Sequence, residues 1–560
     1  MPAAAAGCFE RAVIAALLIY VAVVFSMQAY VVVGGDYFHE EVRSLFRYHP
    51  VSDPALFAGD YLAIFAGAFS QPLLYEGSTR LWLWAGGELL LLHRLLPLFA
   101  WLAFIAGIVV LARRLGDRVT VVGAIGLVVA QPVYLHQIAS ALPHAFAFPL
   151  LVWAIVAAQH RSARWLAGLV ILAGLLYPVV APLLGLLLVW RVFLTQSVFS
   201  RQPVELAKAV LLVGATGLAA LWLLYGVLSG PEHLGTPLEP LQGADVYPEN
   251  GPEGRHFYGT LSPFIYVVAK VGLQFRTWFG PFWLALLSIF GLIGLCGVFA
   301  LPRRSDAGRA MIAFIVCGTV LCLVISVLRP FQVYRFLLYP TLTVLPLLFV
   351  LGLQQLFRRI KGGTRHANVA VIALVGLFVL ACDSLDARKL GYWWRFEPET
   401  RQVMVFVAEQ PPDTRFAIWP DVESSLELIP YIARRPLLVM QKLHYPGYES
   451  HILAMRERLD DLIDAYLAGA EPPLRKLHCR WGVDHLVVNK AHFTEVESRP
   501  AYFRPFDARI EEVWGSRDGK DFLLRAPDPR LVALETESYF ILDLRRIAPA
   551  GCGLAAAADG

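Results

Sequence analysis

The chain contains the run AVIAALLIYVAVVFSMQAYVVV at residues 12–33, which continues directly into GGDYFHEE at residues 34–41. The first run is largely apolar and reaches the ~20 residues that a straight membrane helix needs. It is longer than the ~7–15-residue apolar core of a secretory signal peptide, and no convincing small-residue cleavage site follows it. The stretch therefore predicts a retained membrane helix that ends at an acidic loop.

Ten further apolar runs follow the first. The eleven runs are 12–33, 95–112, 119–134, 141–158, 165–177, 179–194, 207–228, 279–301, 310–328, 336–357 and 367–382. With 57% hydrophobic and 16% charged residues and a mean hydropathy of +0.57, the chain is too apolar for a soluble protein, in which about 25% of residues are charged. We therefore predict a polytopic α-helical membrane protein with about eleven transmembrane helices.

Basic residues between these runs predict the orientation of the helices. Threaded alternately from a cytoplasmic N-terminus, the runs leave these clusters inside: Arg11, Arg113/Arg114/Arg118, Arg161/Arg164, Arg191/Arg201/Lys208, Arg303/Arg304/Arg309 and Arg358/Arg359/Lys361/Arg365. Positive charge is retained in the cytoplasm, so everything after about residue 383 is expected on the outer side. Because topology explains the basic residues, the net charge of +4 predicts no nucleic-acid partner.

Tyr177-Pro178 is the weakest point of this topology. If the proline only kinked a single helix over 165–194, every later loop would change sides and the basic clusters at 303–309 and 358–365 would lie outside. The charge pattern therefore favours two helices that meet at a tight outer turn.

The outer side is predicted to carry two long loops, 34–94 and 229–277, a short turn at 329–335, and a C-terminal domain at 383–548. Helices are expected at 399–410, 449–468 and 474–481, and strands at 415–419, 436–440, 485–488, 510–514 and 521–525. This alternation predicts a small α/β domain. Residues 549–560 are expected to be a disordered tail, and Cys479 and Cys552 could pair on the oxidising side.

Acidic residues of the first outer loop are the candidate catalytic groups. Asp36, Glu40 and Glu41 follow the first helix, where a carboxylate next to hydrocarbon is costly unless it is paired or functional. On a helix, Asp36 and Glu40 would share one face and could hold a divalent cation, or one of them could act as general base. Asp60 is a further candidate. The alternatives are an ordinary hydrated loop for the cluster and a simple turn for Asp60.

Basic residues on the outer side are candidate ligands of a lipid phosphate, because guanidinium and ammonium groups bind phosphate oxygens. The candidates are Arg335, Arg329, Arg276, Lys270, Arg435 and Lys442. Interfacial snorkelling is the alternative for the arginines near the membrane, and a solvated rim for the last two. His144 opens the fourth predicted span and is interpreted as a satisfied helix-start residue.

No nucleotide-binding or hydrolase motif is present: the chain lacks GxxxxGK[ST], GxGxxG, HExxH and GxSxG. The predicted cytoplasmic loops are also too short for a nucleotide-binding domain. An enzyme built on this chain would use a substrate that is already activated on the outer side, such as a membrane-resident phospho-donor.

Three stretches carry a resemblance to a known family. They are YHPVSDPALFAGD at 48–60, RPFQVYR at 329–335 and WGVDHLVV at 481–488. With a first span that leads into an acidic loop, about eleven spans and a C-terminal outer domain, the chain resembles the GT-C integral-membrane glycosyltransferases. These include protein mannosyltransferases, aminoarabinose transferases and oligosaccharyltransferase catalytic subunits.

The resemblance implies a polyprenyl-phosphate-linked sugar donor and a functional carboxylate in the first outer loop, for which Asp36 fits best. It also implies a multi-pass protein of the bacterial inner membrane and an acceptor that is a lipid, a glycan or a protein. The tight acidic pair of the family is not reproduced, because the next acids after Asp36 are Glu40 and Glu41, and this departure leaves metal dependence open. Asp36 and Glu40 would be the ligands of any Mg or Mn ion. Trp393-Trp394 is followed by Arg395, which departs from the Trp-Trp-Asp signature of oligosaccharyltransferases.

Two other functions remain open from the sequence. One is a transporter or flippase that binds a lipid-linked saccharide, although the nearly uncharged spans favour a site at the outer mouth over a path through the membrane. The other is a GT-C-like membrane protein without catalytic activity.

Overall fold

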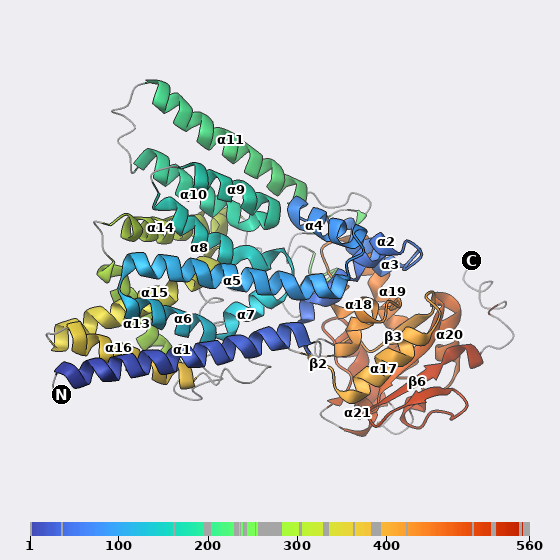
Figure 1. The fold of residues 1–560 in the computed structure, drawn as a ribbon. Coiled ribbons are helices and arrows are strands. Elements are labelled where there is room, and N and C mark those ends of the chain that lie inside the picture. The colour runs from blue at the N-terminus through green and yellow to red at the C-terminus, as the bar shows by residue number, and fades with distance from the viewer. Residues whose placement is uncertain are drawn as a thin grey trace.

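The structure, a computed structural model, describes most of the chain (Figure 1). The described residues are 3–34, 37–160, 163–194, 203–228, 234–235, 237–238, 243–251, 254–255, 283–301, 305–328, 335–361, 364–381, 394–421, 424–495, 498–516, 522–547 and 552. Two parts are seen: a helical bundle, and a C-terminal domain with a small sheet.

The apolar runs form the helical bundle, and each of the eleven predicted runs contains a helix. The helices are α1 (Ala3–Gly34), α5 (Leu89–Leu115), α6 (Arg118–Ala130), α7 (Pro132–Ala139), α8 (Ala147–Ala158), α9 (Arg164–Leu176), α10 (Ala181–Val189), α11 (Pro203–Leu228), α13 (Trp283–Ala300), α14 (Asp306–Leu328), α15 (Arg335–Lys361) and α16 (Thr364–Ala381). An aromatic cluster of Trp101, Phe104, Tyr134 and Phe148 packs at the centre of the bundle.

The lengths of these helices indicate a multi-pass membrane protein. Within the described residues, five helices are long and apolar enough to cross a membrane, and a sixth span arises if the bent pair Arg118–Ala130 and Val133–Ala139 counts as one. The other apolar helices have 10–17 residues. The count of eleven transmembrane spans therefore stays a prediction.

The helix is interrupted at Tyr177-Pro178, as the charge pattern predicted. Helix α9 ends at Leu176, a single 3-10 turn covers Pro178–Val180, and α10 begins at Ala181. Proline lacks a backbone N–H and its ring clashes with the preceding turn, so a continuous helix is disfavoured there. The two helices lie side by side in Figure 1.

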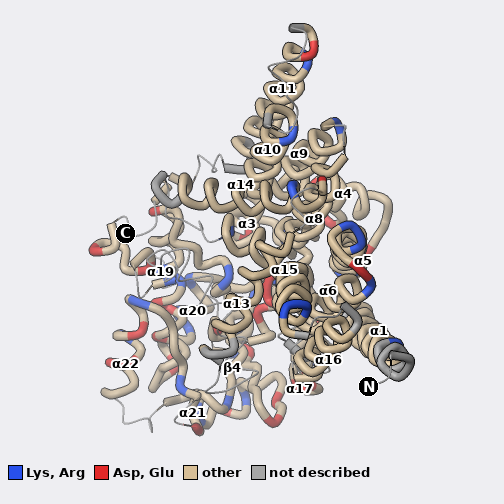
Figure 2. Tube along the Cα trace, turned by 90° about the vertical axis from the view of Figure 1, so that its left-hand side faces the viewer, with Lys and Arg blue, Asp and Glu red and all other residues tan. Residues whose placement is uncertain are grey.

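The C-terminal domain is built on a four-stranded sheet with the order β3-β4-β6-β5. The strands are β3 (Arg415–Ile418), β4 (Val483–Asn489), β5 (Val532–Glu535) and β6 (Tyr539–Asp543), with β3 parallel to β4 and the other two pairings antiparallel. Its longer helices are α17 (Pro398–Glu409), α19 (Glu449–Tyr466), α20 (Pro472–Trp481) and α22 (Phe506–Ser516). Figure 2 shows charged residues gathered in this domain, whereas most of the bundle is uncharged.

The three predicted helices of this domain and the strands at 415–419 and 485–488 are confirmed. The strand predicted at 510–514 is wrong, because this segment lies in α22 and its apolar residues Ile510, Val513 and Trp514 have the spacing of a helix face. The segment 521–525 contains a 3-10 turn, Leu523–Arg525, and the segment 436–440 makes one isolated bridge, from Leu437 to Phe416.

The first outer loop packs on the C-terminal domain. Strand β1 (Tyr37–Phe38) pairs antiparallel with β2 (Trp394–Arg395), which joins the end of α1 to the start of the domain. The elements after β1 are the 3-10 helix η1 (Glu40–Tyr48), α2 (His49–Ser52), α3 (Tyr61–Ala68) and α4 (Leu73–Trp84). Apolar residues from this loop and from the domain form one shared hydrophobic core.

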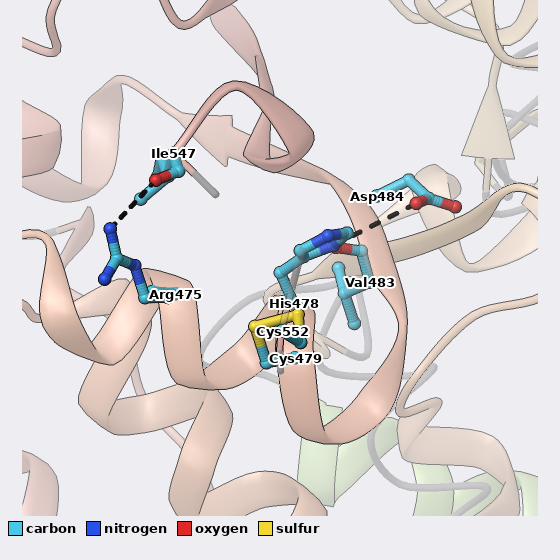
Figure 3. The surroundings of a disulfide bond; sticks show 7 residues. All are labelled: Arg475, His478, Cys479, Val483, Asp484, Ile547 and Cys552. Atoms are coloured by element: carbon cyan, nitrogen blue, oxygen red, sulfur yellow. Dashed lines mark hydrogen bonds and ion pairs between the residues drawn. A yellow bond between two sulfur atoms is a disulfide. The ribbon is translucent and has the colours of Figure 1, made fainter. Parts of the chain in front are cut away.

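Cys479 and Cys552 form a disulfide, the pairing that the sequence left open (Figure 3). Next to it, His478 Nδ1 lies 2.8 Å from the Val483 carbonyl oxygen. The bond ties the end of the chain to α20 across a separation of 73 residues. A disulfide of this kind is typical of an oxidising compartment.

Candidate functional site

Four of the predicted site residues, Asp36, Lys270, Arg276 and Arg329, lie outside the described residues. The structure places the other six, Glu40, Glu41, Asp60, Arg335, Arg435 and Lys442. It brings Glu41, Lys442 and Arg335 to one region, between the end of the helical bundle and the C-terminal domain.

Glu41 and Lys442 form an ion pair between the outer loop and the C-terminal domain. Glu41 lies in the first turn of η1, and Lys442 lies in the 3-10 turn η12 (Gln441–Leu443). Their side chains are only 21% and 22% exposed. Burial acts to raise the pKa of Glu41, but the nearby Lys442 ammonium and the imidazoles outweigh it, so its pKa lies far below the usual range. Glu41 is therefore a fixed negative charge that orients Lys442.

Two histidines in contact continue the cluster into the bundle. His39 Nδ1 accepts a hydrogen bond from the Glu41 backbone N–H at 3.1 Å, and its Nε2 lies 3.0 Å from Nδ1 of His136 on α7. Because Nδ1 of His39 is an acceptor, its Nε2 carries the proton and donates to His136. Burial and the neighbouring His136 hold the pKa of His39 well below its usual value. His39 is therefore neutral at physiological pH.

His144 and Arg335 complete the cluster. His144 interacts electrostatically with Glu41, Arg335, Lys442 and His136, and its ring centre lies 6.4 Å from that of Tyr177. Arg335 is the first residue of α15, and its guanidinium donates to the Tyr177 hydroxyl at 3.1 Å. We name Glu41, Lys442, His39, His136, His144 and Arg335 the junction cluster. It combines two cations with three imidazoles and one carboxylate.

A buried ion pair supports the segments that carry two residues of the junction cluster, Glu41 and Lys442. Glu427, which is completely buried, binds the Arg43 guanidinium and accepts the backbone N–H groups of Gln441 and Lys442. Burial raises the pKa of Glu427, against the opposing effect of Arg43. Glu427 thus fixes both the backbone that carries Lys442 and the helix that carries Glu41. Sequence reasoning missed it; a lone carboxylate in the apolar segment Leu426–Tyr431 was the available signal.

The other described candidates lie in contacts that hold the fold together. Asp60 caps α3 through the Ala63 N–H at 2.9 Å and lies 3.7 Å from Arg415. Glu40 lies 3.9 Å from Arg43. The Arg435 guanidinium donates to backbone carbonyls of its own domain, those of Ala408, Gln410, Ala433 and Arg434.

Among the residues that the structure describes, no three His, Cys, Asp or Glu side chains are grouped so that they could hold a metal ion. Because Asp36 is not among them, the ligand set of Asp36 and Glu40 stays a prediction.

Two further histidines are buried where the outer loop meets the domain. His49 Nε2 lies 2.7 Å from the Tyr431 carbonyl oxygen, and His451 Nε2 lies 2.8 Å from that of Leu443. Burial lowers the pKa of both imidazoles from 6.5 to about 4, although the carbonyl contacts favour the charged form. Both side chains are therefore neutral in the folded protein.

Acidification should separate the outer loop from the domain. The unfolded chain binds protons at these histidines below about pH 6.5, whereas the folded chain does so only near pH 4. Above pH 6.5 the two neutral histidines contribute their full stabilisation of the folded state. This contribution to the free energy of unfolding is lost as the pH falls toward 4, by up to about 3 kcal/mol for each histidine. Thermal unfolding in detergent between pH 7 and 4 measures this loss. The double variant His49→Gln/His451→Gln should show a flatter pH dependence; an unchanged slope would contradict the assignment.

Comparison with known proteins gives matches among solved structures. No known protein family matches the chain, and no curated protein is similar to it. The archaeal oligosaccharyltransferase AglB from Archaeoglobus fulgidus, in complex with an inhibitory peptide and a dolichol-phosphate, is 12% identical with a TM-score of 0.44, over 85% of this chain and 69% of that chain. The A. fulgidus oligosaccharyltransferase in complex with Zn and sulfate is 13% identical with a TM-score of 0.48, over 88% and 70%.

ArnT from Cupriavidus metallidurans, bound to undecaprenyl phosphate, is 12% identical with a TM-score of 0.40, over 95% of this chain and 97% of that chain. AglB and ArnT are both GT-C glycosyltransferases, the class that the sequence resembles.

Proposed function

We propose that the protein is a membrane glycosyltransferase that moves a sugar from a polyprenyl-phosphate-linked donor to an acceptor at the outer face of the membrane. The junction cluster carries this proposal. Two cations, Lys442 and Arg335, lie at the end of an apolar bundle, where the phosphate of a membrane-resident lipid would be found. The Glu41 carboxylate holds Lys442 and the Tyr177 hydroxyl holds Arg335, so both cations are ordered before a ligand arrives.

In the proposed reaction, Lys442 and Arg335 bind the donor phosphate and stabilise the charge that develops on it as the leaving group. An acceptor hydroxyl attacks the anomeric carbon from the opposite face, the bond between that carbon and the phosphate oxygen breaks, and the polyprenyl phosphate departs. The acceptor proton passes to a carboxylate, for which Asp36 is the candidate. In the sequence, Asp36 falls between the residues of α1 and those of β1 and precedes Glu41 by five residues. Glu41 is a poorer base, because its pKa is far below the usual range.

In the proposed orientation, the junction cluster and the C-terminal domain lie outside the cytoplasm. The membrane is proposed to be the inner membrane of a bacterium. The disulfide between Cys479 and Cys552 supports an oxidising environment for the domain. The acceptor is proposed as a lipid, a glycan or a protein.

Purified protein in nanodiscs, given radiolabelled polyprenyl-phosphate sugar, tests this function. Turnover supports a transferase, donor binding without turnover supports a non-catalytic or transporting protein, and no binding contradicts all three functions.

Asp36→Asn should abolish transfer while insertion and donor binding persist, because only the proton acceptor is lost. Arg335→Ala should weaken donor binding by about 1.5–3 kcal/mol, the range for a hydrogen bond to a charged group.

Glu40→Gln and Asp60→Asn are matched controls in the same outer loop and should keep transfer. If one of them loses activity while Asp36→Asn keeps it, the catalytic carboxylate is wrongly assigned. If all three retain full activity, the first outer loop is not the catalytic centre.

A further inference from the structure

Helix α4 of the first outer loop has a buried face and an exposed apolar face. The buried face consists of Tyr75, Thr79 and Leu83. On the other side Leu73, Leu81 and Trp84 are exposed, Trp84 by 82% and Leu81 by 63%. At about 100° per residue these three positions fall within one arc of roughly 80°. A soluble loop helix would carry polar residues on such a face.

The place of α4 in the fold identifies what covers this face. The helix contacts α5 and α9, and Figure 1 shows it next to the end of α11 that leads toward the outer loops. The neighbouring ends of the spans expose apolar residues as well: Leu91 on α5, and Trp222 and Tyr225 on α11. Exposed apolar residues of α4 thus lie near exposed apolar residues of two long apolar helices, α5 and α11.

We propose that α4 lies in the membrane–water interface on the outer side of the membrane, with Leu73, Leu81 and Trp84 in contact with lipid acyl chains. Its 12 residues are too few to span a bilayer, which takes about 20. A short helix with one apolar face and a terminal tryptophan is suited to the interface, where aromatic side chains are enriched. The proposal does not depend on the proposed function.

The buried side of α4 connects this lipid contact to the junction cluster. The Tyr75 hydroxyl donates to the Ala141 carbonyl oxygen at 2.9 Å, three residues before His144. The Glu76 carboxylate accepts the hydroxyl of Tyr48, the last residue of η1, at 2.6 Å. Helix α4 thus contacts two of the segments that carry the cluster, η1 and the segment that leads to His144. Its position in the interface would fix the depth of the cluster relative to the bilayer surface.

A fluorescence experiment on the full chain tests the proposal. Leu81→Cys is introduced into a chain whose five cysteines outside the disulfide are replaced by alanine, and the new thiol is labelled with an environment-sensitive fluorophore. The protein is placed in phosphatidylcholine nanodiscs that contain lipid with a spin label near the headgroup end of the acyl chain. Ser52→Cys, an exposed polar position on α2 of the same loop, is the matched control.

The label at position 81 should lose most of its fluorescence to the spin-labelled lipid, whereas the label at position 52 should lose little. Equal and weak quenching at both positions would overturn the proposal. Efficient cross-linking between two chains of the Leu81→Cys variant in nanodiscs would overturn it as well, because a second copy would then cover this face.

Discussion

Glu427→Ala should lower the free energy of unfolding by about 3–5 kcal/mol, the cost of breaking a buried ion pair through loss of one partner. Glu427 is completely buried and binds Arg43 from the outer loop, so its removal leaves a guanidinium in the interior without its carboxylate. The backbone N–H groups of Gln441 and Lys442 lose their acceptor in the same step. Thermal unfolding of the purified protein in detergent, followed by intrinsic fluorescence, measures the effect.

Glu457→Ala is the matched control, because Glu457 pairs with Arg480 on the surface of the same domain and is 58% exposed. Its loss should cost at most about 1 kcal/mol, since exposed pairs contribute little. The double variant Arg43→Leu/Glu427→Leu should recover part of the stability, because no unpaired charge remains buried. Equal effects of Glu427→Ala and Glu457→Ala would show that the buried pair does not join the loop to the domain.

Lys442→Met should reduce sugar transfer by roughly 10- to 150-fold, which corresponds to the loss of about 1.5–3 kcal/mol of charged hydrogen bonding to the donor phosphate. The substitution also leaves Glu41 buried without its cation, so the effect of burial is no longer outweighed and the pKa of Glu41 rises.

Lys476→Met is the matched control for this variant. Lys476 pairs with Asp461 on the same domain and is 52% exposed, away from the junction cluster. Lys476→Met should leave the rate of sugar transfer unchanged. If Lys442→Met behaves like this control, Lys442 has no part in donor binding.

Features that depend on local patterns were predictable from the sequence. Long apolar runs favour helices, so every predicted run contains a helix, and Pro178 interrupts the helix because of its own covalent geometry. Strands were harder, because a short apolar run is ambiguous between strand and helix. The segment 510–514 became part of α22, and β5 and β6 were missed.

The candidate site was only partly predictable. Glu41, Lys442 and Arg335 were candidates by residue type and by their place on the outer side, yet no local pattern pairs residues as distant as 41 and 442. Arg43 and Glu427, separated by 384 positions, meet only in the folded chain. Arg435, which by composition resembled Lys442, is engaged by backbone carbonyls, a contact that residue type does not reveal.

The pairing of β1 with β2 has a consequence for biogenesis. Tyr37 follows the helix α1 in the sequence, and its partner Arg395 comes only after the other helices of the bundle. During synthesis the first outer loop therefore has its apolar face and Arg43 uncovered until the C-terminal domain has been made. Contacts of such long sequence separation form late, and the waiting intermediate is exposed to aggregation and proteolysis.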